Sequence, residues 1–86
     1  MSDLKTRFDD AVARSKTLTR RPDNATLLKL YASYKQASLG DATGARPDVF
    51  DLVATAKFDA WDAIQGTSRD DAMAAYVELI DKLSAS

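Results

Sequence analysis

The chain has 86 residues, of which 45% are hydrophobic and 29% charged, and its formal net charge is −1. A chain of this length builds one small core, so residues 1–86 are expected to form a single domain. The sequence contains no cysteine and no histidine. Their absence excludes disulfides, thiolate nucleophiles, the common zinc sites and every Ser/His or Cys/His catalytic pair. Most enzyme classes are thereby excluded, and we expect no metal site, no cofactor and no catalysis.

The two parts of the chain carry opposite charge. Residues 1–46 contain nine Lys/Arg and five Asp/Glu, a balance of +4, and residues 47–86 contain three and eight, a balance of −5. The basic part favours an anionic partner, while the acidic part argues against nucleic acid. The densest basic stretch consists of Arg14, Lys16, Arg20 and Arg21. Such clusters also occur where cations only solvate the end of a helix.

No stretch of the sequence reaches about 18 uncharged residues, which is the length that a membrane-spanning helix needs. The first residues include Asp3, Lys5 and Arg7 in place of an apolar leader. We therefore expect a cytoplasmic protein without membrane insertion.

Apolar residues at helical spacing predict a first helix over residues 2–16, with Ser2 as its cap. The repeating positions are Leu4, Phe8, Ala11, Val12 and Leu18. Pro22 disfavours helix in the residue before it, so the pattern should break before this proline. The next helix is expected over residues 24–39, between a cap at Asp23 or Asn24 and a left-handed Gly40.

Two neighbouring faces of this second helix differ in chemistry. One face, predicted to lie in the core, holds Leu30, Tyr34 and Ala37. The flanking strip holds Leu27, Leu28, Tyr31 and Lys35. A phenol can stack on a base, an ammonium can bind phosphate and leucines can cover an alkyl chain, so the strip suits an amphiphilic ligand. A Tyr/Lys pair at a solvated helix boundary is the plainer alternative.

The remaining sequence predicts two more helices. The third should cover residues 48–65 and end at Gly66, with Phe50, Phe58 and Trp61 beside its apolar stripe. That stripe consists of Val49, Leu52, Val53, Ala56, Ala60 and Ile64. Ser68 with Asp71 forms a capping signal for the fourth helix. Its stripe consists of Met73, Tyr76, Val77, Ile80 and Leu83.

Strand-like alternation is lacking, so the fold class is all-α. The longest connection, residues 40–47, can carry the chain back across the bundle. A four-helix bundle in up-down-down-up order follows from the lengths of the connections.

Four stretches carry a resemblance to a known family. They are LLKLYASYKQASLGD from Leu27, the Arg46-Pro47 pair, ATAKFDAWDAIQGTS from Ala54 and RDDAMAAYVELIDKL from Arg69. Together they closely resemble the acyl-CoA-binding protein family, over a span from Phe8 to Leu83. The resemblance implies a four-helix bundle that binds medium- and long-chain acyl-CoA thioesters without transforming them, as an intracellular carrier and pool former. We expect a monomer, because one small core uses all four apolar stripes.

The resemblance also implies roles for individual residues. Tyr31 would stack near the adenine and donate to phosphate, and Lys35 and Lys57 would bind the 3′-phosphate of the ribose. Tyr76 would close over the nucleotide, and Lys16 matches a further basic position near it. The motif residues Ala32, Ser33 and Tyr34 complete the expected binding set. The expected acyl groove consists of Ala11, Val12, Leu27 and Leu28.

Two positions depart from the family pattern. Val53, Ala54 and Thr55 stand where the family commonly has a glycine and lysines, so this edge carries less positive charge. Phe58 replaces a tryptophan, which keeps an apolar ring but removes an N–H donor. A helical protein-interaction module without a small-molecule ligand is the alternative function, since amphipathic stripes would serve it equally well.

Overall fold

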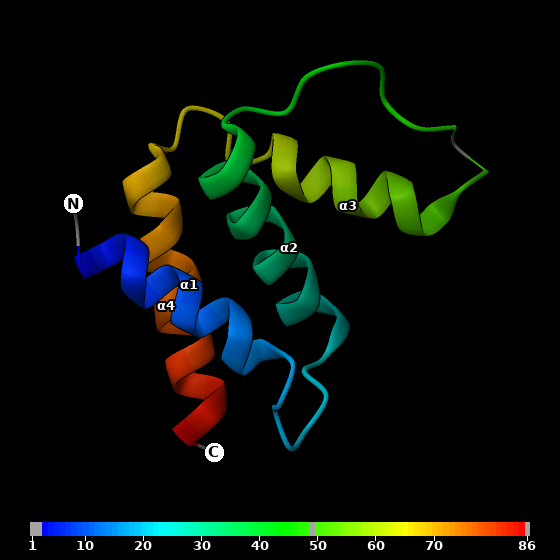
Figure 1. Ribbon diagram of the computed structural model, residues 1–86. Helices are drawn as coiled ribbons and strands as arrows, with labels where there is room; N and C mark the ends of the chain where they lie inside the picture. Colours follow the sequence, from blue (N-terminus) through cyan, green and yellow to red (C-terminus); the bar gives the residue numbers. More distant parts are fainter. Residues whose placement is uncertain (1–2, 49, 86) are drawn as a thin grey trace.

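The computed structural model describes residues 3–48 and 50–85, and it contains four helices in up-down-down-up order (Figure 1). They are α1 (Asp3–Ser15), α2 (Asn24–Leu39), α3 (Leu52–Asp62) and α4 (Arg69–Ala85). No strand occurs in these two ranges. The predicted all-α, four-helix fold is confirmed.

The helices form a flat molecule with extents of 36 × 31 × 15 Å. Helix α4 packs on α1 and on α2, and α2 packs on α3. Figure 1 shows α1 and α4 running in the same general direction and α2 running against them. Helix α3 crosses α2 obliquely and extends away from the other two helices. Within the described residues α3 therefore depends on α2 alone for helix packing.

The main core lies where α1, α2 and α4 meet. Its buried members are Phe8, Ala11, Leu30, Ala37, Ala72, Tyr76, Val77 and Ile80. Burying a large side chain such as Phe8, Leu30 or Ile80 stabilises the fold by about 1.5–3 kcal/mol. These contacts therefore supply most of the driving force for folding. Helix α3 contributes none of these residues, and its own buried side chain is Trp61. Tyr34, predicted to be in the core, is 41% exposed, because its position lies at the edge of the α2 face that packs on α4.

Capping residues explain most helix boundaries. The Asp23 carboxylate accepts a hydrogen bond from the Thr26 N–H at 2.8 Å, and the Ser68 hydroxyl accepts one from the Asp71 N–H at 3.0 Å. Gly40 ends α2 with φ of 86°, a conformation that disfavours residues with a Cβ. These predicted signals are confirmed. The cap predicted at Ser2 lies outside the described residues.

Helix α3 is shorter than the predicted range 48–65. The Asp51 carboxylate accepts a hydrogen bond from the Ala54 N–H at 3.0 Å and starts the helix there. The other end closes in a turn over residues 63–66. Leu52 and Val53, predicted in a buried stripe, are 77% and 65% exposed, because no described helix packs against the first turn of α3. Val49 lies outside the described residues.

A network of polar side chains holds α3 against α2. The Trp61 indole N–H donates to the Gly40 carbonyl at 2.8 Å and to the Gln36 side-chain oxygen at 3.1 Å. The Gln36 amide nitrogen in turn donates to the Asp41 carboxylate at 2.7 Å and to the Thr67 carbonyl at 2.9 Å. Gln36 is only 1% exposed, and its bond with the Trp61 indole is buried, while the other three bonds of the network are part-buried. The network therefore fixes the position of the last turn of α3 against the end of α2.

A second tie joins the connection after α2 to α3. The Arg46 guanidinium donates two hydrogen bonds to the Asp59 carboxylate, at 2.9 and 2.8 Å. This paired geometry lowers the pKa of Asp59, mainly through the hydrogen bonds from Arg46. The pair is half-exposed, so it orients the connection more than it stabilises the fold.

Removing the Gln36 amide should destabilise the protein markedly. Gln36→Ala leaves the Thr67 carbonyl without this donor and weakens the anchoring of Trp61, which we expect to lower the free energy of unfolding by about 2–3 kcal/mol. Ser38→Ala, on an exposed position of the same helix, serves as the matched control and should change it by less than about 0.5 kcal/mol. Urea unfolding followed by circular dichroism measures both. Equal stability of the two variants would contradict the anchoring role of the network.

Stability should also depend on the ionisation of Asp41. The Gly66 N–H, and then the Gln36 amide, donate to this carboxylate and lower its pKa below the ordinary 3.8. Because the folded pKa is the lower one, the stabilisation is present above pH 4 and is lost as the pH falls through the folded pKa. Asp41→Asn should therefore flatten the loss of stability below about pH 4. Asp62→Asn, at an exposed position of α3, should keep the wild-type acid dependence in the same urea titrations.

Candidate functional site

A hollow of about 280 Å³ lies between α2, α4 and the connection from α1 to α2. Its lining consists of Ser15, Leu18, Pro22, Leu27, Leu30, Tyr31, Tyr34 and Tyr76. Half of these residues come from α2, because positions three and four apart share one helix face. The hollow is open to solvent and combines an aliphatic wall with three phenol rings. Such a surface suits a ligand with both apolar and ring-shaped parts.

Aromatic contacts fix the inner wall of the hollow. The Phe8 ring stacks on Tyr34 at 6.1 Å between centroids and meets Tyr76 edge-on at 5.3 Å. Tyr76 is 5% exposed and belongs to the core, while Tyr34 stands at the rim. Packed rings of this kind are preorganised, so a ligand would not have to order them on binding.

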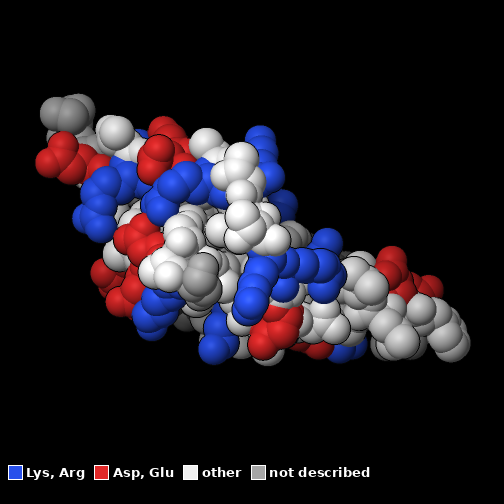
Figure 2. All heavy atoms as spheres, turned by 90° about the horizontal axis from the view of Figure 1, so that it is seen from below, with Lys and Arg blue, Asp and Glu red and all other residues white. Residues whose placement is uncertain are grey.

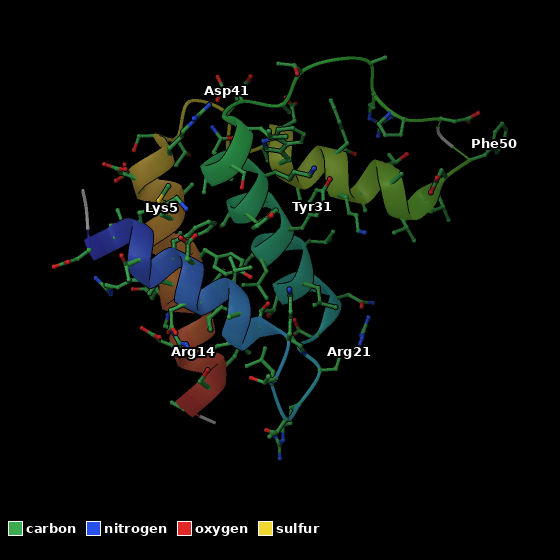
Figure 3. The ribbon with its side chains drawn as sticks, viewed as in Figure 1. Lys5, Arg14, Arg21, Tyr31, Asp41 and Phe50 are labelled. Carbon is green, nitrogen blue, oxygen red and sulfur yellow. The ribbon has the colours of Figure 1, made fainter. Side chains whose placement is uncertain are left out.

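Two lysines from different helices lie beside Tyr31. The Lys57 Nζ is 5.4 Å from the centre of the Tyr31 ring, and the Lys35 Nζ is 5.8 Å from it. Lys35 also lies 5.7 Å from the Trp61 ring. Figure 3 shows Tyr31 in the angle between α2 and α3. The structure therefore brings together Tyr31, Lys35 and Lys57, which we call the Tyr31 cluster.

The lysines of the Tyr31 cluster have no carboxylate partner among the described residues. Lys5, Arg14 and Arg46, by contrast, are engaged in ion pairs at 2.8 Å. Cation–ring contacts are worth about 0.5–1 kcal/mol at exposed sites and leave the charge unneutralised. Two ammonium groups beside one ring therefore form a place where an anionic group would be held.

The basic stretch from Arg14 to Arg21 is divided by the fold. Arg14 donates to the Asp81 carboxylate at 2.8 Å and to Asp10 at 3.0 Å, so it joins α1 to α4 and is not free to bind an anion. Lys16, Arg20 and Arg21 are exposed on the connection between α1 and α2. Lys16 directly follows Ser15, which lines the hollow. In the view from below, Lys and Arg side chains are spread over the left and middle parts of the molecule, with acidic side chains among them (Figure 2).

Several expected site residues are placed away from the hollow. Ala11 is fully buried, so it packs in the core and cannot line an open groove. Val12 is half-buried and packs against the same core. Ala32 and Ser33, 3% and 7% exposed, lie on the side of α2 that packs on neighbouring helices. Leu27 lines the hollow, and Leu28 is half-buried one position further.

Sequence reasoning missed part of the lining. Leu18 was assigned only to the apolar stripe of the first helix, and Pro22 only to a helix break, yet both line the hollow. Both positions lie in the connection between α1 and α2, so helical spacing does not indicate that they face this hollow. Trp61 was treated as an apolar neighbour of a stripe, although its ring lies beside Lys35. The indole contact depends on a partner 25 residues away and has no local signature.

The described residues lack both a metal-binding group and a membrane-spanning helix. They contain no group of three or more acidic, cysteine or histidine side chains placed to hold a metal ion. Within the same ranges no helix is long and apolar enough to cross a bilayer.

Comparison with known proteins agrees with this geometry. The family model described as "Acyl CoA binding protein" matches residues 5–80. The chain is 51% identical over 78 residues to "Acyl-CoA-binding protein homolog 1" of Caenorhabditis elegans, covering 91% of each chain. It is 43% identical over 79 residues to rat "Enoyl-CoA delta isomerase 2", covering 92% of this chain but 20% of that protein.

A solved structure shows the same fold. The crystal structure of Oryza sativa Acyl-CoA-Binding Protein 2 superposes with a TM-score of 0.88 at 39% identity, over 93% of this chain and 89% of that one. The family model and the relatives together cover nearly all of the described helices. The chain therefore belongs to the acyl-CoA-binding protein family.

Proposed function

We propose that this chain binds medium- and long-chain acyl-CoA thioesters without covalent change and carries them as a monomer in the cytoplasm. The observation that supports this function best is the position of the Tyr31 cluster at the edge of an apolar hollow. Tyr31 belongs to both, since its ring faces two lysines and also lines the hollow. A ligand with an anionic nucleotide and an alkyl tail can use both surfaces at once.

Each residue of the site has a part in this proposal. Tyr31 stacks on the adenine, and Lys35 and Lys57 bind phosphate through charge-assisted hydrogen bonds. Lys16 adds positive charge from the end of α1, and Tyr76 forms the inner wall. Leu27 and Leu28 cover the tail. Ala32 and Ser33, being buried, support α2 and do not contact the ligand in this arrangement.

The energetics require both parts of the ligand. Nanomolar affinity corresponds to about 12 kcal/mol, and two charge-assisted hydrogen bonds contribute about 1.5–3 kcal/mol each. Association itself costs several kcal/mol more. Tail burial at about 0.8 kcal/mol per CH₂ must supply much of the remainder.

Calorimetry should therefore show palmitoyl-CoA binding far more tightly than free coenzyme A, and equal affinities would contradict the proposal.

Catalysis has no support in this chain. Without histidine or cysteine, the site holds no group that ordinarily exchanges protons near pH 7. The matched segment covers only 20% of the isomerase relative. The activity in that protein's name can therefore reside in the part that this chain does not match. Binding without reaction is the function that the residues present can perform.

Loss of either cluster lysine should weaken every CoA compound alike. Lys35→Ala or Lys57→Ala removes one phosphate contact, so we expect dissociation constants for coenzyme A, octanoyl-CoA and palmitoyl-CoA to rise by a similar factor, about tenfold or more. Lys29→Ala, on an exposed position of the same helix as Lys35, is the matched control and should change them less than about twofold. Calorimetry of the three ligands measures these changes. Normal binding by both cluster variants would overturn the phosphate assignment.

A change in the wall of the hollow should act on the tail alone. Leu27→Ser removes apolar surface that lines the hollow, and we expect it to weaken palmitoyl-CoA by about tenfold while leaving coenzyme A unchanged. Leu39→Ser, at an exposed leucine of the same helix outside the hollow, should bind both ligands normally. The ratio of the two dissociation constants, measured for each variant, is the readout. An unchanged ratio in Leu27→Ser would place the tail elsewhere.

A further inference from the structure

The connection between α1 and α2 carries an exposed hydroxyl group that the ligand site does not use. Thr19 lies in this connection, outside any helix, and its side chain is exposed. Its hydroxyl forms no hydrogen bond with another described residue. The two hydroxyls before it are engaged, since Ser15 donates to the Val12 carbonyl at 2.6 Å and Thr17 to the Arg14 carbonyl at 3.1 Å. Thr19 therefore offers an unengaged acceptor oxygen on a non-helical segment.

Three cations stand close to Thr19 along the chain. Lys16 precedes it by three residues, and Arg20 and Arg21 follow it directly. All three are exposed, and none forms an ion pair with another described residue. No carboxylate occurs from Lys16 to Pro22. Protein kinases select substrates partly by charge pattern, and a kinase with an acidic cleft favours a hydroxyl that has cations on both sides.

Other hydroxyl groups of the chain lack this combination. Thr6 follows Lys5, but it lies within α1, and Lys5 is paired with the Asp9 carboxylate at 2.8 Å. The Ser68 hydroxyl accepts the capping bond from the Asp71 N–H and is followed by acidic residues. Unpaired cations, exposure and an unengaged hydroxyl thus occur together at Thr19.

Thr19 also lies beside the hollow of the ligand site. Leu18 and Pro22, on either side of it in the chain, both line that hollow. Leu18 and Thr19 together line a smaller hollow of about 140 Å³, which has no carboxylate in its lining. A group attached to the Thr19 oxygen therefore has space. Consecutive Cα atoms are about 3.8 Å apart, so such a group stands roughly 10 Å from a ligand in the larger hollow.

We infer that Thr19 is a phosphorylation site and that its phosphate weakens the binding of acyl-CoA. A protein kinase with an acidic cleft transfers the γ-phosphoryl group of ATP to Thr19 Oγ1. The bond from the γ-phosphorus to the bridging oxygen breaks and leaves ADP, the bond from Oγ1 to phosphorus forms, and the hydroxyl proton passes to a base of the kinase. The effect on binding rests on the proposed function. The modification itself depends only on the connection.

The phosphate acts on the ligand through charge. It carries about −1.5 to −2 at pH 7, so it offsets the cations around it and repels the phosphates of the nucleotide. Salt screens this repulsion, because the Debye length is about 8 Å at 0.15 M and about 30 Å at 0.01 M. We therefore expect phosphorylation to raise the dissociation constant about fivefold at 0.15 M salt and about twentyfold at 0.01 M.

Phosphorylation of the full chain in vitro tests the site. The protein is incubated with ATP and protein kinase C, a kinase that accepts hydroxyls with cations on both sides. Mass spectrometry of the intact chain and of its peptides then identifies the modified residue. Calorimetry measures the dissociation constant of palmitoyl-CoA for the modified and unmodified protein at both salt concentrations. Thr19→Ala should gain no phosphate and should bind palmitoyl-CoA as wild type does, before and after the treatment.

A pair of charge variants tests the effect on binding without the kinase. Thr19→Glu should raise the dissociation constants of palmitoyl-CoA and coenzyme A alike, by about threefold at 0.01 M salt. Thr43→Glu is the matched control, because Thr43 is an exposed threonine in the connection between α2 and α3, at the opposite end of α2 (Figure 1). It should change both constants by less than about 1.5-fold. Equal affinities of the two variants would overturn the effect that we assign to Thr19.

Three other results would also overturn the inference. The first is a treated chain without phosphate on Thr19, including one modified only at Ser15 or Thr17. The second is wild-type affinity of the phosphorylated chain at 0.01 M salt. The third is a loss of affinity that is equal at both salt concentrations, since the phosphate would then deform the hollow and not act through charge. If unmodified protein binds no palmitoyl-CoA, the proposed function fails, and mass spectrometry still decides whether Thr19 accepts phosphate.

Discussion

The hydrogen bonds of the Trp61 indole are the constraint on which the candidate site depends. Helix α3 contributes nothing to the core built by α1, α2 and α4, so it has no large apolar face to hold it in place. Its position is set by Trp61, whose N–H reaches the Gly40 carbonyl at 2.8 Å and the side chain of Gln36 at 3.1 Å. Lys57 lies one helical turn before Trp61 and thereby comes within 5.4 Å of the Tyr31 ring. A lost indole contact would move a lysine of the site, although neither Trp61 nor Gln36 lines the hollow.

The division of charge between paired and unpaired cations separates structure from function. Arg14 and Arg46 sit against carboxylates and join elements of the fold, and these contacts raise their pKa further. Lys35 and Lys57 instead lie against aromatic rings, which attract a cation without neutralising it. The protein therefore has two populations of basic residues that composition alone cannot tell apart. The second population can take an anionic ligand without breaking an ion pair of the folded chain.

Much of the fold could be predicted from the sequence because caps act locally. Asp23, Gly40 and Ser68 each mark a boundary through contacts within a few residues, and those boundaries are confirmed. The predicted start of α3, at residue 48, was wrong for a related reason. Asp48 and Asp51 are both good caps, and apolar spacing continues through both of them, so the pattern could not decide which one begins the helix.

The site divides in the same way. Tyr31 and Lys35 follow from spacing on α2, whereas the presence of Lys57 beside them was expected from family resemblance, since no pattern within α2 points to α3. Leu18 and Pro22 line the hollow from the connection between α1 and α2. Contacts within one helical turn could be predicted from the sequence, because the residues involved are neighbours along the chain. The contact of Trp61 with Gln36 joins residues 25 apart, so it depends on how the helices cross.

Helix α3 is exposed at its first turn and is held by polar contacts at its last turn, and these two features are related. A helix that buried Leu52 and Val53 against the bundle would gain apolar stabilisation of about 1.5–3 kcal/mol for each side chain. Instead, α3 is anchored through Trp61 in its last turn, and its first turn remains exposed. The polar contacts of Trp61 and Gln36 therefore hold α3 against α2 where apolar burial at its first turn is lacking.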